Sequence, residues 1–388
     1  MTTVKKIAAM LDEAVARGTV AGAVALAVRR DGTLFEAAAG RRDPSGAGAM
    51  SPDTIFWLAS MTKAIVSVAA MQLVEQGRLS LDAPVGEVLP ALARPQVLTG
   101  FDSAGAPLLR PARTVMTLRH LLSHSAGFGY TDWNPALRRA LEHLELPRTP
   151  TNFDQVARMP LLFDPGADWN YGISTDMVGL LVEAASRHSL EHYLREHVLG
   201  PLGMEDTAFL LSPAQQARRA RMHRRGADGG LQPIDLAAGQ GQGFTGGGGG
   251  LCGSPTDYGR FLRMLLNGGT LDGVRLLHAA TVAEMSRNQI GKSKVHTLVS
   301  TAPERSNDAN FFPGMVQKWG LGFLLNTRPG PNGRSAGSLA WGGLCNSYFW
   351  LDPTRGVAGC LMTQVLPFAD PAVLDLFGAV ERAAYAGR

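Results

Sequence analysis

The sequence predicts an α+β fold: an α/β sandwich, with an antiparallel sheet flanked by helices, joined to a helical domain. Short runs of strand composition, separated by turn residues, occur near both ends of the chain, at residues 22–39 and 319–363. Residues 81–240 between them show helical spacing of apolar residues and many loops. We therefore expect a discontinuous α/β domain of residues 1–80 and 241–388, with residues 81–240 inserted as the mainly helical domain.

The N-terminal elements follow from local patterns. Apolar residues at helical spacing predict a helix over 3–17. Small and β-branched residues on either side of an Asp-Gly turn predict a hairpin of strands over 22–28 and 33–39. The apolar stretch 55–76 predicts a buried helix.

The middle of the chain has weaker patterns. Residues 94–113 show little periodicity and are expected to form a surface loop, whereas residues 117–123 predict a short amphipathic helix. Five consecutive glycines at 246–250 predict a segment that is flexible or approaches a ligand. Further helices are expected at 177–186, 190–198 and 256–266.

The C-terminal part returns to strand composition with Gly, Pro and Asn between the runs. These runs predict the larger share of the sheet, and a closing helix follows them. The expected strands are 319–325, 338–341, 348–351 and 357–363, and the expected helix is 372–384.

Composition and charge exclude several classes of protein. The chain has 388 residues, 45% hydrophobic and 18% charged, which describes a well-buried globular protein. The formal net charge is +4, and the one basic cluster, at 218–225, is expected to be a solvated helix end leading into a loop. No aromatic platform accompanies this cluster, so we expect no nucleic-acid partner.

Cysteine usage and hydropathy bear on compartment and cofactors. Three cysteines, at positions 252, 345 and 360, argue against a disulfide framework and fit a reducing compartment. No Cys/His spacing suits a metal, so we expect neither metal nor cofactor. The N-terminus lacks the apolar core of a signal peptide, and no apolar run is long enough to span a membrane. A cytoplasmic protein without a membrane partner is therefore expected, and the oligomeric state stays open.

The strongest chemical signal is Ser60-Met61-Thr62-Lys63 within the apolar stretch 55–76. On a helix, positions i and i+3 share one face, so Ser60 and Lys63 point the same way. Burial disfavours the charged form of an amine, and a neutral amine can act as the base that a serine nucleophile needs. From four residues alone, a partly exposed lysine at a helix start is an equally good interpretation.

Two further motifs can complete such a site. Tyr171 lies on the loop before a predicted helix, from which its hydroxyl can reach a neighbouring serine. Trp341-Gly342-Gly343-Leu344 ends a predicted strand, where a backbone N–H can bind an oxyanion and two glycines let a substrate approach. The structural alternatives are a tyrosine that packs under its loop and a β-bulge beside a buried tryptophan.

Taken together and in this order, the three motifs resemble the class C β-lactamase and penicillin-binding-protein superfamily. Within it, the chain most resembles the family VIII carboxylesterases. The resemblance runs from about residue 5 to residue 385. Further stretches that match are 56–63, 117–127, 201–204 and 248–251.

The resemblance implies a role for each motif residue. Ser60 would be the acylated nucleophile, and Lys63 would lower or accept its proton. Tyr171 would pass the proton to the leaving group. The backbone N–H groups of Ser60 and Leu344 would form the oxyanion hole, and Trp341 would line the acyl or alcohol pocket. His120 and His124 would be structural.

Two departures from the β-lactamase pattern bear on the substrate. Ile173 stands where β-lactamases have the asparagine of Tyr-x-Asn. Trp341-Gly342-Gly343 stands where they have a basic residue followed by Thr-Gly, and this replacement is typical of the esterase group. An indole in place of a cation suits an uncharged ester and penalises a buried carboxylate. We therefore place Trp341, Gly342, Gly343 and Ile173 at the substrate.

The resemblance therefore implies a serine carboxylesterase that hydrolyses short-chain esters of small molecules through an acyl-enzyme. Three alternatives stay open. The first is an amide hydrolase of the β-lactamase or DD-peptidase kind, against which the missing cation counts. The second is an acyltransferase that passes the acyl group to an alcohol. The third is a non-catalytic binding protein, against which the intact Ser60, Lys63 and Tyr171 count.

Overall fold

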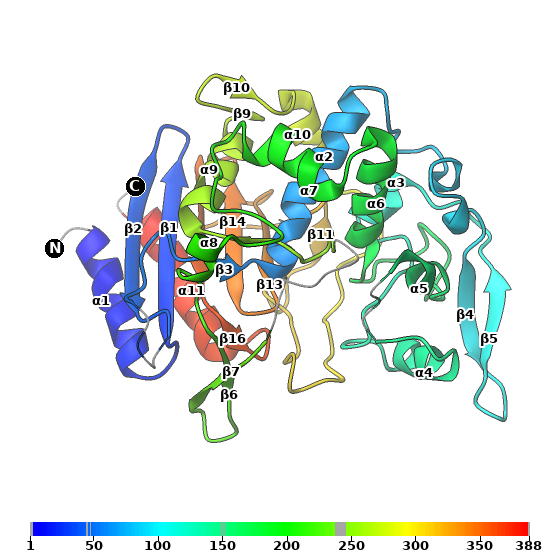
Figure 1. Cartoon of the computed structure of the whole chain (residues 1–388), viewed down its shortest axis with the longest axis horizontal. Coiled ribbons are helices and arrows are strands. Elements are labelled where there is room, and N and C mark those ends of the chain that lie inside the picture. The colour runs from blue at the N-terminus through cyan, green and yellow to red at the C-terminus, as the bar shows by residue number, and fades with distance from the viewer. Residues whose placement is uncertain are drawn as a thin grey trace.

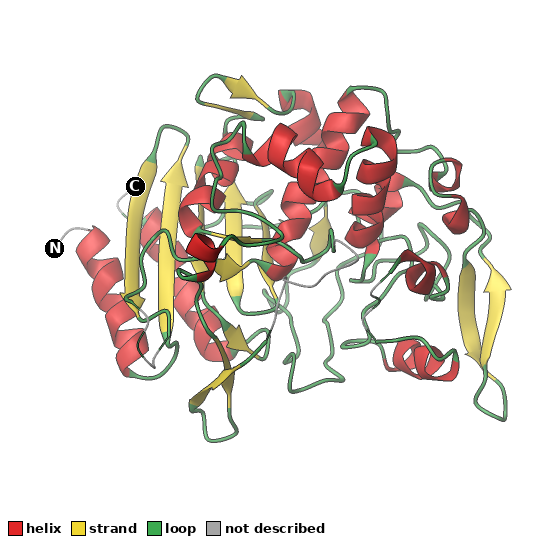
Figure 2. Cartoon of the chain, in the orientation of Figure 1, coloured by secondary structure: helices red, strands yellow, loops and turns green. Residues whose placement is uncertain are grey.

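The structure is a computed structural model that describes residues 3–43, 46, 48–148, 150, 152–236 and 246–386. A seven-stranded sheet in which all neighbouring strands are antiparallel forms its centre (Figures 1 and 2). The strands are β1 (Gly22–Arg29), β2 (Thr33–Gly40), β11 (Gln317–Trp319), β12 (Leu324–Asn326), β13 (Leu339–Gly343), β14 (Ser347–Asp352) and β15 (Val357–Met362). Their order is β11-β12-β13-β14-β15-β1-β2, so both ends of the chain build one sheet, as predicted.

Helices cover both faces of this sheet. Successive residues of a strand point to opposite faces. Phe349 of β14 packs against Tyr258 of α9 (Pro255–Leu266), with ring centroids 5.3 Å apart. The next residue, Trp350, packs against Phe377 of α11 (Pro371–Tyr385), with centroids 5.7 Å apart. α1 (Thr3–Ala16) contacts α11 and shares its face.

The remaining elements lie mostly in the middle of the chain, and α3, α4, α5, α6, β4 and β5 gather on the right in Figure 1, beyond β11. The helices are α2 (Thr62–Glu75), α3 (Leu118–Leu122), α4 (Pro135–His143), α5 (Phe153–Ala157), α6 (Ser174–Ser186), α7 (Leu190–Leu194), α8 (Pro213–Gln216) and α10 (Ala279–Met285). Single helical turns are η1 (Ala59–Met61), η2 (Val85–Glu87), η3 (Pro90–Leu92) and η4 (Arg195–Leu199). Small strand pairs are β3 (Phe56–Trp57) with β8 (Cys252–Gly253), β4 (Gln96–Phe101) with β5 (Pro107–Pro111), and β9 (Thr270–Leu271) with β10 (Val274–Arg275). A three-stranded sheet holds β16 (Val365–Leu366), β6 (Met222–Arg225) and β7 (Leu231–Ile234).

α2 lies in the interior. Every residue from Thr62 to Leu73 is buried, including Lys63, and the helix packs against α6 and α7. A helix that is apolar on all sides is buried on all sides. The turn η1, which directly precedes α2, contacts β13 of the sheet.

Three predicted elements were wrong in detail. Residues 94–113 form the β4–β5 hairpin, and a register shift at Leu98/Gly100 interrupts the alternation by which a strand is recognised. Residues 319–325 are two strands, because Gly322 (φ +97°) turns the chain between β11 and β12. The stretch 55–76 begins with strand β3, and Ala59 (φ +45°) separates it from the helix.

The basic cluster 218–225 also differs from its prediction. It runs into strand β6 and is not a helix end. Three of its arginines form ion pairs within the protein: Arg218 with Asp206, Arg221 with Asp43, and Arg225 with Asp370. The cluster is therefore part of the folded framework. The domain boundaries at residues 80 and 240 stay a prediction. Among the described residues, no helix is long and apolar enough to cross a bilayer.

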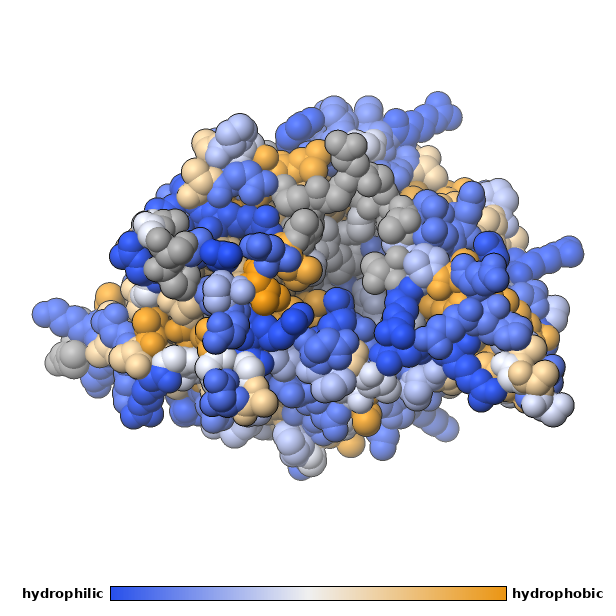
Figure 3. Space-filling model, turned by 60° about the horizontal axis from the view of Figure 1, so that its bottom comes forward, coloured by the Kyte–Doolittle hydropathy of each residue, from blue (hydrophilic) through white to orange (hydrophobic). Residues whose placement is uncertain are grey.

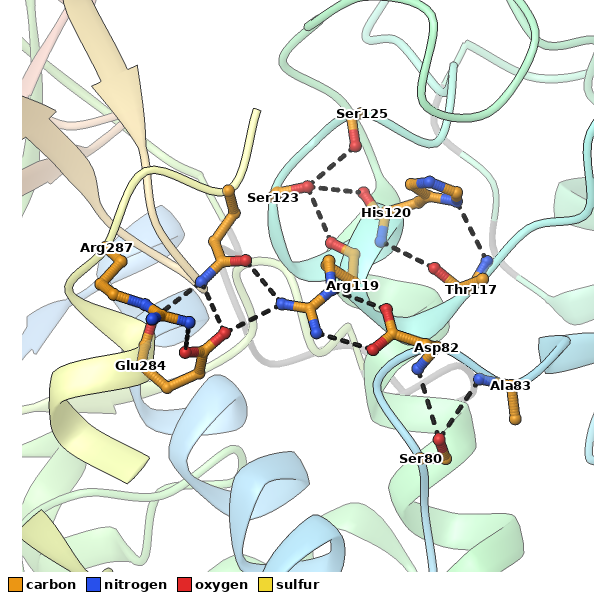
Figure 4. Close-up of polar contacts among 11 residues, drawn as sticks. Ser80, Asp82, Ala83, Thr117, Arg119, His120, Ser123, Ser125, Glu284 and Arg287 are labelled. Carbon is orange, nitrogen blue, oxygen red and sulfur yellow. Dashed lines mark hydrogen bonds and ion pairs between the residues drawn. The ribbon is translucent and has the colours of Figure 1, made fainter. Parts of the chain in front are cut away.

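Arg119 of α3 joins three segments of the chain (Figure 4). Its guanidinium binds Asp82 at 2.7 Å, Glu284 at 3.0 Å and the side-chain oxygen of Gln289 at 2.6 Å. At the other end of α3, the carbonyl of Leu122 accepts hydrogen bonds from the segment around β11 and β12. This network fixes α3 and the loop that follows it, which enters the site described below.

We expect Arg119→Ala to lower the free energy of unfolding by about 2 kcal/mol, because it leaves partly buried partners without their donor. Urea denaturation followed by circular dichroism measures the change. Arg17→Ala is the matched control, since Arg17 pairs with Glu13 in solvent and should contribute less than about 0.5 kcal/mol. Equal losses in the two variants would contradict a structural role for the network.

Candidate active site

Ser60 lies in η1, on the short connection between β3 and α2. The residue before it, Ala59, has φ +45°, a conformation that a side chain disfavours and that persists only where the surroundings fix it. Leu251 supplies that support, because its carbonyl accepts the N–H of Leu58 at 2.9 Å and its N–H donates to the Thr62 hydroxyl at 3.1 Å. Ser60 is thus presented on a rigid turn at the start of a buried helix.

Lys63 Nζ has three polar contacts. It lies 3.1 Å from Ser60 Oγ, 3.1 Å from the Tyr130 hydroxyl and 2.6 Å from the carbonyl oxygen of Gly248. The lysine side chain is 1% exposed, so water does not compete for these contacts. The predicted pairing of Ser60 with Lys63 is therefore present in the structure, and the alternative of a partly exposed lysine is not.

The three contacts suit either protonation state of the amine. An ammonium offers three N–H donors, one for each partner. A neutral amine offers two donors, for Tyr130 and Gly248, and a lone pair that accepts the Ser60 hydroxyl proton. A proton can therefore pass from Ser60 to Lys63 with no change of partners.

Tyr130 is the site residue that sequence reasoning missed. It is partly buried, and burial raises the pKa of its hydroxyl well above the usual value, with the negative charge of Asp176 adding to the effect. At neutral pH it is therefore a neutral hydroxyl that accepts a hydrogen bond from Lys63. The signal that could have identified it is its position three residues after the 117–127 stretch.

Tyr171 also reaches the site, in a different contact. Its ring centroid lies 4.9 Å from Lys63 Nζ, and its hydroxyl accepts a hydrogen bond from Trp341 Nε1 at 3.0 Å. Trp341 in turn packs edge-on against Trp319, with centroids 4.6 Å apart. The motif residues Ser60, Lys63, Tyr171 and Trp341 are thus brought together, and the proton-shuttle role of Tyr171 stays a prediction.

His124 fills the space behind Tyr171. Its ring lies 4.9 Å from that of Tyr171 and 5.1 Å from that of Trp319, and among the described residues neither of its buried ring nitrogens has a hydrogen-bond partner. Burial lowers the pKa of His124 well below its usual value, and the Lys63 charge lowers it further. A neutral, packed imidazole agrees with the structural role expected of it.

The end of β13 meets the turn that carries Ser60. A Cβ on Gly343 would lie 2.3 Å from the carbonyl oxygen of Leu58, and one on Gly342 would lie 2.4 Å from the Tyr348 ring. These glycines are therefore required by packing inside the protein, in addition to any approach of substrate. Gly343 is in close contact with residues 58 and 59, which directly precede Ser60. The oxyanion hole made by the N–H groups of Ser60 and Leu344 stays a prediction.

Ile173 is placed in the core more than at an open surface. It is 5% exposed and immediately precedes α6. The substrate contact of Ile173 stays a prediction.

The face of the molecule shown in Figure 3 is hollowed at its centre, with hydrophobic side chains along one wall. This face is the side of the molecule on which α2 begins in Figure 1.

Residues 246–251, called the glycine arm, form a hydrogen-bonded turn where the sequence predicted a segment that is flexible or approaches a ligand. The N–H groups of Gly249 and Gly250 both donate to the carbonyl of Gly246. Trp57 Nε1 donates to the Gly249 carbonyl at 2.7 Å, and the Gly248 carbonyl accepts from Lys63. The arm is therefore one wall of the lysine site. The rest of the glycine-rich run lies outside the described residues.

Fold and site together define a serine hydrolase or acyltransferase with a Ser-x-x-Lys pair, on a seven-stranded antiparallel sheet covered by helices. Residues 7–383 match the Beta-lactamase family, and the chain belongs to that family. Its place is among the class C β-lactamase-like esterases and acyltransferases.

Named relatives agree with this placement. The chain is 35% identical over 392 residues to monacolin J acid methylbutanoyltransferase of Aspergillus terreus, covering 96% of this chain and 94% of that protein. It is 30% identical over 382 residues to lovastatin esterase of Penicillium rubens, covering 94% of each. Unliganded simvastatin synthase of Aspergillus terreus superposes with a TM-score of 0.86 at 32% identity, over 100% of this chain and 98% of that one.

We expect Tyr130→Phe to lower kcat by about tenfold, the scale of one lost hydrogen bond to Lys63. Tyr171→Phe should lower kcat by at least about 100-fold, the range of a group that transfers protons. Steady-state kinetics on a chromogenic ester separates the two. A larger loss for Tyr130→Phe than for Tyr171→Phe would show that the shuttle role belongs to Tyr130.

Proposed function

We propose that the protein is a serine carboxylesterase that hydrolyses short-chain carboxylic esters of small molecules through an acyl-enzyme on Ser60. The observation that carries this proposal is the buried Lys63 amine 3.1 Å from the Ser60 hydroxyl. A serine hydroxyl is a weak nucleophile until a neighbouring base takes its proton. Lys63 is the group in place to do so.

Acylation follows from the positions of these groups. Ser60 Oγ attacks the ester carbonyl carbon while its proton passes to Lys63 Nζ. The carbonyl oxygen becomes an oxyanion that accepts hydrogen bonds from the N–H groups of Ser60 and Leu344. When the ester C–O bond breaks, the leaving alkoxide takes a proton delivered by Tyr171 from Lys63, and the alcohol departs.

Deacylation uses the same groups in reverse. A water molecule attacks the acyl carbonyl and gives a proton to the Lys63–Tyr171 pair. The bond to Ser60 Oγ then breaks, Ser60 recovers its proton, and the carboxylic acid leaves. Lys63 Nζ lies 4.9 Å from the centre of the Tyr171 ring, so each half-reaction can draw on both groups.

The preference for an uncharged ester rests on Trp341. The indole stands where β-lactamases carry a cation, and its N–H is already occupied by the Tyr171 hydroxyl. A substrate carboxylate placed there would be buried without a partner, which is unfavourable by about 2 kcal/mol or more. The name lovastatin esterase, given to a relative, supports an ester of a small molecule as the substrate.

We also propose a cytoplasmic location, because three cysteines scattered along the chain fit a reducing compartment.

Acyl transfer to an alcohol is the second candidate. It differs from hydrolysis only in the second half-reaction, where an alcohol replaces water at the acyl-enzyme. It is favoured by relatives named as transferases, among them the monacolin J acid methylbutanoyltransferase. The residues around Ser60 serve either acceptor.

The proposal is tested by initial rates of wild type and Ser60→Ala on p-nitrophenyl butyrate and on a chromogenic cephalosporin. We expect ester cleavage that falls by about 10⁴-fold or more in the variant, as for loss of a nucleophile, and little cephalosporin turnover. Faster turnover of the cephalosporin than of the ester would replace the esterase assignment by a β-lactamase. Adding an alcohol and analysing the products gives the ratio of transfer to hydrolysis.

A further inference from the structure

The glycine arm is attached to the first turn of α6 by one carboxylate. Asp176 lies in that turn, and its Oδ1 accepts the backbone N–H of Gly248 at 3.0 Å. The carbonyl of the same glycine accepts Lys63 Nζ at 2.6 Å. The two backbone polar groups of Gly248 therefore connect Asp176 to Lys63, although neither side chain needs to touch the other.

The fit between the arm and α6 leaves no room for adjustment. A Cβ on Gly248 would lie 2.5 Å from Asp176 Oδ2, and one on Gly247 would lie 2.8 Å from the Thr175 carbonyl oxygen. Side-chain carbons are essentially never found at such distances. The position of the Gly248 carbonyl is therefore determined by where Asp176 holds the backbone.

The charge of Asp176 also acts on the site. Its place in the first turn of α6 is one where the helix dipole favours a negative charge. Burial raises the pKa of Asp176, and the Lys63 charge and the Gly248 N–H oppose that effect. Asp176 thus acts on Lys63 in two ways: it holds Gly248, which accepts a hydrogen bond from the amine, and its negative charge lies near the amine.

We propose that Asp176 is a positioning residue for Lys63: it fixes the Gly248 carbonyl against the amine and so keeps Nζ within reach of Ser60. The inference rests on the proposed Ser60 acyl-enzyme and deepens it. Asp176 contacts neither Ser60 nor the reacting atoms in this account, so its loss acts on the rate of the chemical step and not on substrate binding.

Asp257 provides the matched control. It also lies in the first turn of a helix, α9, and also accepts a backbone N–H, from Asp206 at 2.8 Å, with a further bond from the Thr207 hydroxyl at 2.9 Å. In the described part of the chain, none of its hydrogen-bond partners belongs to the lysine site. Loss of either carboxylate removes an acceptor for a backbone N–H near a helix start, but only Asp176 holds a residue that contacts Lys63.

The experiment compares Asp176→Ala, Asp257→Ala and Ser60→Ala with wild type on p-nitrophenyl butyrate, with the melting temperature of each. For Asp176→Ala we expect kcat to fall by about 100-fold, the scale of a displaced catalytic group, with KM little changed. Asp257→Ala should lower the melting temperature by a similar amount and leave kcat near wild type.

Asp176→Asn separates position from charge. Its amide oxygen can still accept the Gly248 N–H, so kcat at the plateau should fall by no more than about tenfold, the scale of one weakened hydrogen bond. KM should stay near the wild-type value, because Asp176→Asn changes no group that the proposed mechanism places against the substrate.

The outcomes distinguish the two proposals. If Asp176→Ala keeps kcat within about twofold of wild type while Ser60→Ala is inactive, the positioning role is overturned and the acyl-enzyme stands. The positioning role is also overturned if Asp257→Ala loses as much kcat as Asp176→Ala, or if Asp176→Asn, which keeps an acceptor for the Gly248 N–H, loses as much kcat as Asp176→Ala. If Ser60→Ala remains active, both proposals fail, because Lys63 then has no nucleophile to serve.

Discussion

The burial of one amine among three oxygen atoms is the constraint on which the rest of the site depends. Lys63 is shielded from water, and a buried ammonium without partners would be strongly unfavourable. Ser60, Tyr130 and Gly248 supply those partners from three parts of the chain. The amine is thereby stable in the interior and within reach of the serine, where it can exchange a proton with it.

The fold brings these parts together through close backbone contacts. η1 carries the serine and α2 carries the lysine, and the residues just before Ser60 lie against the end of β13 at Gly343. α6 carries Asp176 and the loop before it carries Tyr171, and the glycine arm lies between α6 and α2. The contacts of Gly247 and Gly248 with α6 leave no room for a side chain at either position. Together, the sheet, α2 and the glycine arm therefore fix the positions of Ser60 Oγ and Lys63 Nζ.

The sequence predicted what depends on short-range pattern. Ser60 and Lys63 are three residues apart on a helix, so their contact follows from helical geometry. The contacts of Lys63 with Tyr130 and Gly248 span 67 and 185 residues, and no local pattern contains them. The β4–β5 hairpin was missed because a register shift interrupts its alternation, and the glycine arm because its order comes from bonds to distant groups. The sheet was predicted because its strands are apolar runs punctuated by turns.

The most direct test of the central claim is the pre-steady-state rate of Ser60 acylation in Lys63→Arg, measured by rapid quench and mass spectrometry of the acylated peptide. Arginine keeps the positive charge but does not release its proton at neutral pH. If Lys63 accepts the Ser60 proton, wild type shows a burst of one acyl group per chain on the peptide containing Ser60, and the variant shows none. A variant acylated on Ser60 at the wild-type rate would contradict the account.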